Sequence, residues 1–207
     1  MLKYFLYNWI SPNSKWISKS IYRILEINRT LPVDKKIRVI SISFGCNNND
    51  FLKAIDDAGK EGVFVISSSL RRTHKLRFHG LGKESSTNPD DINSYLPGSW
   101  WSKSFYKNPK SLKIDSTLLV PMDSRCIASQ NGNNDYVFYL YAGWSWSIPY
   151  IAGLYALACQ VKPSVTPQEF WDKALETGDI IEIDKDNKKY KFGKIVNPVK
   201  LMGKLKK

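Results

Sequence analysis

A serine beside a glycine opens the most apolar stretch of the chain, AGWSWSIPYIAGLYALACQV at residues 142–161. Gly143 would let a peptide backbone approach closely, because glycine has no side chain. We expect Ser145 at the start of a buried helix, where the helix dipole favours negative charge. A backbone N–H in that position can stabilise the oxyanion of acyl transfer. The pattern therefore predicts a serine nucleophile, and its structural alternative is a helix N-cap, a common role of serine.

Residues 142–175 resemble the nucleophile segment of the subtilisin-like serine peptidases, the subtilases. The family pattern is roughly SGTSMATPHVAGAAALL, followed by a capped T-P-E/Q and a further helix. The residues that match it identically or in size are Gly143, Ser145, Ser147, Pro149, Ile151, Ala152 and Gly153. The resemblance implies hydrolysis of peptide bonds through Ser145, with the amide of the same residue in the oxyanion hole.

Three further blocks extend the resemblance over nearly the whole chain. VISISFG at residues 39–45 is similar to the subtilase strand VINMSLG, whose end lines the substrate cleft. Residues 50–69 are similar to the family's ALxxAVxxAxxxGVxVVAAAGN, and residues 191–202 to its closing YGxGxVNAxKAL. The resemblance implies a peptide or protein substrate, and the residues expected to bind it are Ser43, Phe44, Gly45, Gly143 and Trp144.

The chain departs from the family where the catalytic triad is concerned. Subtilases place Asp and then His upstream of the VINMSLG strand, but no histidine here precedes His74. Asp34 is interpreted as an ordinary loop acid, and His79 follows two predicted strands instead of preceding them. A serine hydroxyl needs a base that takes its proton. We therefore expect the chain alone to be inactive or nearly so.

Two further departures affect the predicted cleft. SSSLR at residues 67–71 occupies the stretch in which subtilases carry an oxyanion-hole asparagine. Arg71 is either a substitute cationic donor or a solvated loop arginine. Trp144 and Trp146 replace the small neighbours of the family serine, so their indoles would narrow or fill the cleft.

Two functional hypotheses follow from these matches and departures. In the first, the chain is the C-terminal portion of a subtilase domain, and its partner is an upstream segment that supplies Asp and His. In the second, it is a pseudopeptidase that binds a peptide or a partner protein in the retained cleft.

A third class, a basic nucleic-acid binder, rests only on the lysine-rich tail and on the basic residues from Arg71 to Arg77. The net charge is +12, but the eight lysines within residues 188–207, which contain no acid, leave only +4 for the rest of the chain. No nucleic-acid motif accompanies this charge. We therefore predict no nucleic-acid partner.

The cysteines and histidines do not form a metal or disulfide pattern. Cys46, Cys126 and Cys159 are odd in number and far apart, and His74 and His79 have no cysteine near them. Structural thiols and ordinary loop histidines are the simpler interpretation. We expect no metal and no cofactor.

The uncharged run at residues 136–161 is long enough to span a bilayer. Its first part, residues 136–141, is β-branched or aromatic and indicates a strand, after which Gly143 breaks the run. A strand, a turn and a buried helix are therefore predicted in place of a membrane span. The N-terminus, MLKYFLYNWISPNSKW, lacks a signal-peptide cleavage pattern, and the compartment stays open.

The elements that must position the site alternate between helix and strand. Apolar spacing predicts a helix at residues 15–28 and a second helix from an Asn49 cap to Gly62. Buried strands are predicted at residues 37–44 and 63–66. This alternation indicates a parallel sheet with right-handed crossovers.

The second half of the chain has equally clear element boundaries. Residues 67–116 are expected to form a long, packed loop, followed by strands at residues 117–121 and 135–141 with a turn between them. Thr166, Pro167 and Glu169 begin a further amphipathic helix. A terminal hairpin is expected at residues 180–183 and 190–196, around Asp186-Asn187.

We therefore predict an α/β domain with a subtilisin-like parallel sheet flanked by helices, truncated at its N-terminal side. The expected divisions are an extension at residues 1–14, the partial peptidase domain at 15–200 and a basic tail at 201–207. Without upstream strands, a sheet edge and apolar surface would be exposed. The isolated chain is accordingly expected to associate or to be poorly soluble.

Overall fold

The computed structural model describes residues 14–45, 48–84, 86–88 and 91–206. The helices are α1 Ser14–Thr30, α2 Asn49–Lys60, α3 Leu70–Thr73, α4 Ser102–Lys107, α5 Trp144–Val161, α6 Pro167–Thr177 and α7 Pro198–Leu205. The strands are β1 Val39–Ile42, β2 Phe64–Ser67, β3 Phe78–Lys83, β4 Tyr95–Pro97, β5 Leu118–Pro121, β6 Arg125–Ala128, β7 Tyr136–Tyr139, β8 Asp179–Lys185 and β9 Lys188–Ile195. Short 3-10 turns are η1 Val33–Lys35, η2 Ile92–Ser94, η3 Pro109–Leu112 and η4 Ile114–Ser116.

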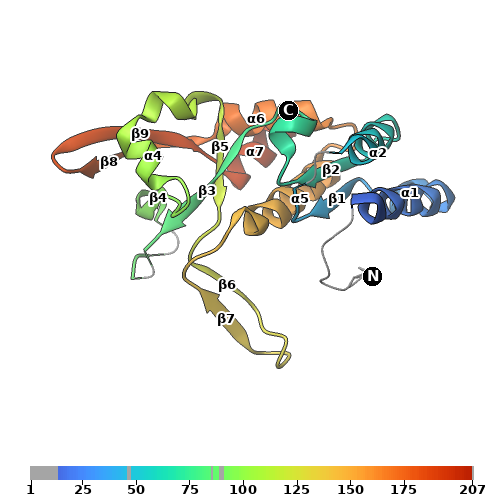
Figure 1. Cartoon of the computed structure of the whole chain (residues 1–207), viewed down its shortest axis with the longest axis horizontal. Helices are drawn as coiled ribbons and strands as arrows, with labels where there is room; N and C mark the ends of the chain where they lie inside the picture. The colour runs from blue at the N-terminus through green and yellow to red at the C-terminus, as the bar shows by residue number, and fades with distance from the viewer. Residues whose placement is uncertain (1–13, 46–47, 85, 89–90, 207) are drawn as a thin grey trace.

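The strands form a parallel pair and a five-stranded sheet, with a separate hairpin. β1 and β2 run parallel, in register from Val39 opposite Phe64 to Ile42 opposite Ser67. The larger sheet has the order β4-β3-β5-β9-β8, and its three middle strands are parallel. Helix α5 packs against β1, β2, β3 and β5, so it joins the two groups of strands (Figure 1). The predicted α/β architecture with a parallel sheet and flanking helices is confirmed.

Three hydrophobic clusters hold these layers together. The largest surrounds α5 and includes β2, β5, α6 and α7. The second packs α1 and α2 on β1, with Leu25 and Phe51 fully buried. The third joins β3, α4, β8 and β9 through Trp101, Phe105 and Phe192. These clusters bury the apolar stripes from which α1, α2 and α6 were predicted.

Local capping chemistry fixes several element ends. The prediction of Asn49 as the cap of α2 is wrong by one residue, because the Asn48 side chain accepts the Phe51 N–H at 2.8 Å. Gly62 has a positive φ of 73°, as expected for the left-handed residue after a helix. Thr166 accepts the Glu169 N–H at 3.1 Å and caps α6 as predicted.

Strand β3 lies inside the segment that was expected to be a long loop. Its sequence, FHGLGK, contains two glycines, which weaken a strand prediction. A Cβ at Gly80 would overlap the Met122 side chain, whose Cβ would lie only 2.6 Å away. The glycine that obscures the strand in the sequence is therefore required by packing in the sheet.

The N-terminal segment lies mostly outside the described residues, whereas the C-terminal segment packs into the core. The expected extension at residues 1–14 lies outside the described residues except for Ser14, which begins α1. The expected boundary between residues 200 and 201 falls inside helix α7, in which Leu201 and Leu205 are buried. Part of the lysine-rich end is thus packed into the main core.

The uncharged run at residues 136–161 is divided between strand β7 and helix α5, as predicted. Figure 1 shows β6 and β7 projecting as an arm away from the rest of the chain. Both strands of this β6–β7 arm, residues 125–139, are largely exposed, and Tyr136 is 71% exposed. Within the described ranges, no helix is long and apolar enough to cross a membrane.

Replacement of Leu201 by Ala tests the packing of α7 against the main core. Leu201 is fully buried, so we expect a loss of about 2–5 kcal/mol in the free energy of unfolding. Val199, which is 82% exposed in the same helix, supplies the matched control, and Val199→Ala should change stability by less than about 0.5 kcal/mol. Urea unfolding monitored by circular dichroism measures both, and equal effects would contradict the packing of α7.

Candidate functional site

Ser43 and Ser145 lie in direct contact although they are 102 residues apart. Ser43 follows strand β1, and Ser145 lies in the first turn of α5. The Ser43 hydroxyl donates to the Ser145 carbonyl at 2.9 Å, and the Ser145 hydroxyl donates to the Ser43 carbonyl at 3.3 Å. Both residues are exposed. The end of β1 and the start of α5 thus form one surface.

The alternative role of Ser145 as a helix N-cap is wrong. Gly143 is the N-cap, in extended conformation with φ of −110° and ψ of 178°, and no side chain caps this helix end. Ser145 is the second residue of the helix, so its hydroxyl is directed to Ser43 instead. Its backbone N–H lies in the first helical turn, where N–H groups have no carbonyl one turn earlier.

The loop after β2 completes this surface. The Ser68 N–H donates to the Phe44 carbonyl at 3.3 Å, and a Cβ on Gly45 would lie 3.3 Å from Ser69 Oγ. Phe44 is 38% exposed. The carboxyl ends of the parallel strands β1 and β2 therefore meet beside α5, which is where open α/β sheets commonly bind ligands.

The two tryptophans beside Ser145 have different surroundings. Trp144 is 40% exposed, and its ring packs against Phe78 and His79 with centroids 5.8 and 5.9 Å away. Trp146 lies against Tyr139 of the β6–β7 arm at 4.9 Å. The partly exposed ring of Trp144, here called the Trp144 wall, thus belongs to the residue before Ser145 and packs against the start of β3.

Sequence reasoning missed the residues that hold the loop before Ser145. The buried Asp123 carboxylate accepts the Ser99 N–H at 3.1 Å and the Ala142 N–H at 2.9 Å. The Trp100 indole donates to the Ala142 carbonyl at 2.8 Å. These bonds fix Ala142, and through it the Gly143 N-cap. Nothing in the spacing of an isolated Asp and Trp signals this role.

Neither histidine contacts the Ser145 hydroxyl. The His74 ring bonds Thr73 Oγ1 at 2.8 Å and packs edge-on against Phe64, and burial lowers the pKa of His74 to about 4. His79 belongs to strand β3, so its interpretation as a loop residue is wrong. Its ring stacks on Trp101 at 4.7 Å.

The electrostatic surroundings of His79 also oppose protonation. Burial lowers the pKa of His79, and the nearby positive charges of Arg71 and Arg77 lower it further. Its Nδ1 atom is buried without a hydrogen-bond partner among the described residues. Within the part of the chain that the structure describes, the Ser145 hydroxyl bonds only the Ser43 carbonyl, which is not a general base.

The next question is whether the described residues could hold a metal ion. Among the described residues, no three His, Cys, Asp or Glu side chains lie close enough to hold a metal ion. Cys126 is exposed and Cys159 is buried, both as free thiols. Burial raises the pKa of the Cys159 thiol. Cys46 lies outside the described residues.

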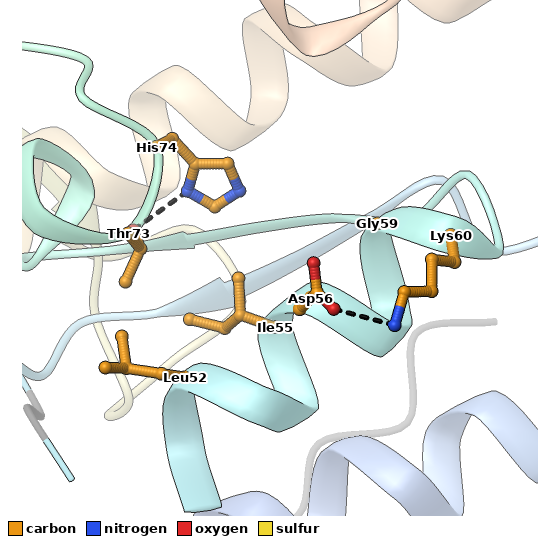
Figure 2. Close-up of a pocket in the computed structure, with 7 residues that line it drawn as sticks. All are labelled: Leu52, Ile55, Asp56, Gly59, Lys60, Thr73 and His74. Carbon is orange, nitrogen blue, oxygen red and sulfur yellow. Dashed lines mark hydrogen bonds and ion pairs between the residues drawn. The ribbon is translucent and has the colours of Figure 1, made fainter. Parts of the chain in front are cut away.

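A separate hollow of about 480 Å³ lies between α2 and the end of α3. Figure 2 shows α2 on one side of this hollow, with Thr73 and His74 on the other. Lys60 closes one end and pairs with Asp56 at 2.7 Å. None of the residues predicted for the serine site lines this hollow, so it is distinct from that site.

Solved structures of subtilisin-like protease domains superpose on the chain at low sequence identity. The prenylagaramide maturation protease PagA matches with a TM-score of 0.56 and 16% identity, over 97% of this chain and 70% of that one. The patellamide maturation protease PatA matches at 0.54 and 14%, over 94% and 69%, and sphericase at 0.55 and 14%, over 80% and 55%. No protein-family model and no curated sequence matches the chain. The chain therefore has the fold of a subtilisin-like protease domain.

The depressed pKa of His74 predicts a loss of stability in mild acid. The unfolded chain takes up a proton near the ordinary pKa of 6.5, but the folded chain does so only near 4. The stabilisation is therefore complete above pH 6.5 and declines as the pH falls towards 4, by roughly 2 kcal/mol between pH 7.5 and pH 5. Urea unfolding at these two pH values should show a smaller decline for His74→Gln than for the native chain. Parallel pH profiles would contradict this account.

Proposed function

We propose that this chain is a subtilisin-like peptidase domain in which Ser145 occupies the nucleophile position. A peptide would lie against Ser43, Phe44 and Gly45, with Gly143 and Trp144 on its other side. The first-turn N–H of Ser145 would face the carbonyl under attack. The chain alone binds the peptide and does not hydrolyse it, because the hydroxyl lacks a base.

One observation carries this proposal: the Ser145 hydroxyl touches the end of β1 at the carboxyl edge of the sheet, and its hydrogen bond goes to a backbone carbonyl. This contact supports a site assembled from the two segments that resemble the family's cleft and nucleophile. The engagement of His74 with Thr73 and of His79 with Trp101 supports the absence of catalysis by this chain alone. Hydrolysis would then require Asp and His from an upstream segment, the proposed partner.

The second candidate is a pseudopeptidase that uses the same cleft only to bind a peptide or a partner protein. The exposed Trp144 wall favours binding, because an aromatic ring offers contact area without reacting. The two candidates differ in the sequence encoded upstream of Met1. D-[ST]-G and H-G-T-H segments there would favour the peptidase.

A fluorophosphonate probe tests the state of Ser145. The probe reacts with activated serines, so we expect labelling of the purified chain no stronger than that of Ser145→Ala. A complete subtilisin-like protease in the same experiment shows that the probe is reactive. Robust labelling of the native chain that disappears in Ser145→Ala would contradict the predicted inactivity.

Replacement of Gly143 by Val tests the proposed cleft without disturbing the core. A Cβ at Gly143 would have no protein atom within 4 Å, and the backbone there is extended, so we expect the free energy of unfolding to change by less than about 1 kcal/mol. The added side chain would obstruct a bound peptide and weaken its binding by about tenfold or more.

Fluorescence anisotropy with a pool of labelled octapeptides of randomised sequence measures this change. Gly153→Ala is the matched control, because Gly153 is exposed farther along α5 and its Cβ would also meet open space. Native-like binding by Gly143→Val, or equal losses in both variants, would place the peptide elsewhere.

A further inference from the structure

The segment between β2 and β3 carries an unusual concentration of unpaired positive charge. Arg71, Arg72, Lys75 and Arg77 lie within seven residues, and none of them takes part in the ion pairs found among the described residues. The lysine-rich end differs, because several of its side chains pair with acids. Those pairs are Lys189 with Glu182, Lys191 with Asp115, Lys200 with Asp179 and Lys204 with Glu176. The segment after β2 therefore carries free positive charge close in sequence to the loop that contacts Gly45.

Arg71 is connected to the candidate cleft through the loop after β2. It is the second residue of α3, and Ser69, two residues earlier, lies against Gly45. Arg71 is exposed. Arg71 thus lies two residues beyond the loop residue that contacts Gly45.

Arg77 approaches the same surface from β3. Its carbonyl accepts the Leu118 N–H at 2.9 Å, so the ladder between β3 and β5 already begins there. Residues two apart on a strand share a face, so Arg77 lies on the face of His79, whose ring contacts Trp144. The lowered pKa of His79 agrees with this placement, because both Arg71 and Arg77 contribute to it.

Arg71 therefore adjoins the loop that contacts Gly45, both Arg71 and Arg77 act on His79, and the Trp144 ring contacts His79. We propose that Arg71 and Arg77 bind the carboxylate of an Asp or Glu side chain in a peptide held in the cleft, while Trp144 packs on its methylene groups. This inference rests on the proposed function and names its substrate class, an acidic peptide. Guanidinium groups suit this role because they form paired hydrogen bonds with carboxylates.

A nucleic-acid phosphate is the competing ligand for the same guanidiniums. The structure favours the peptide, because the unpaired Arg71 adjoins the loop that contacts Gly45 and four lysines of the C-terminal part are engaged with acids. A single-stranded oligonucleotide therefore enters the test as the rival probe.

Fluorescence anisotropy with labelled octapeptides tests the inference. Each peptide consists of Ala and Ser and carries one Glu, Gln or Lys, and the position of this residue is scanned along the peptide. At one position we expect Glu to bind at least about fivefold more tightly than Gln, and Lys most weakly. Arg71→Gln and Arg77→Gln should each reduce this preference to less than about twofold, and 0.5 M NaCl should reduce it in the native chain.

Arg72→Gln is the matched control, because it removes the same charge from an exposed neighbour whose charge does not act on His79. Arg71→Glu should abolish the preference for Glu, because the introduced carboxylate would occupy Arg77. Unfolding midpoints of the variants, all at partly or fully exposed positions, should remain native-like and exclude misfolding as the cause.

The outcomes separate this inference from the proposed function. Binding without preference for Glu, or a preference that Arg72→Gln weakens as much as Arg71→Gln does, would overturn the acidic-peptide inference and leave the cleft in place. An oligonucleotide that displaces the Glu peptide and binds more tightly would assign the arginines to nucleic acid. Failure of every peptide to bind would overturn the proposed function together with this inference.

Discussion

Burial of helix α5 against β1, β2, β3 and β5 is the packing interaction on which the candidate site depends. Ile148, Ile151 and Tyr155 are almost fully buried on this helix, and each such side chain contributes about 1.5–3 kcal/mol of hydrophobic stabilisation. Because the body of the helix is fixed between the two groups of strands, its first turn must emerge at their carboxyl ends. The contact of Ser145 with Ser43 is thus a consequence of core packing more than of its two exposed hydrogen bonds.

Much of the fold was predictable because its signals are local. The apolar stripes of α1 and α2, the Thr166 cap of α6 and the turn at Asp186-Asn187 are all encoded within a few residues. Strand β3 was missed because its Gly80 is needed to make room for Met122, which lies 42 residues away in the sequence. The packed α7 helix was missed for a similar reason, since its lysines conceal two leucines that reach the core.

The candidate site was predictable only where residues resemble a family pattern. Ser145 and Ser43 were identified from two such segments, and the structure brings these distant segments into contact. The support from Asp123 and Trp100 was not predictable, because single polar residues become meaningful only when folding brings backbone donors and acceptors to them. The two histidines show the opposite case. In the fold their rings contact other residues and not the serine hydroxyl.

The β6–β7 arm has a consequence for how the polypeptide can be divided. Its turn, residues 131–134, is exposed and lies at the tip of a hairpin, and exposed loop tips tolerate insertion and cleavage. Strand β5 precedes such a cut and β9 follows it, and these two strands are neighbours in the same sheet. Helix α5, which also follows the cut, packs against β5. Two separately made fragments divided at this tip would therefore reassemble around a shared interior. The arm is equally the natural place to graft a foreign domain without opening the serine surface.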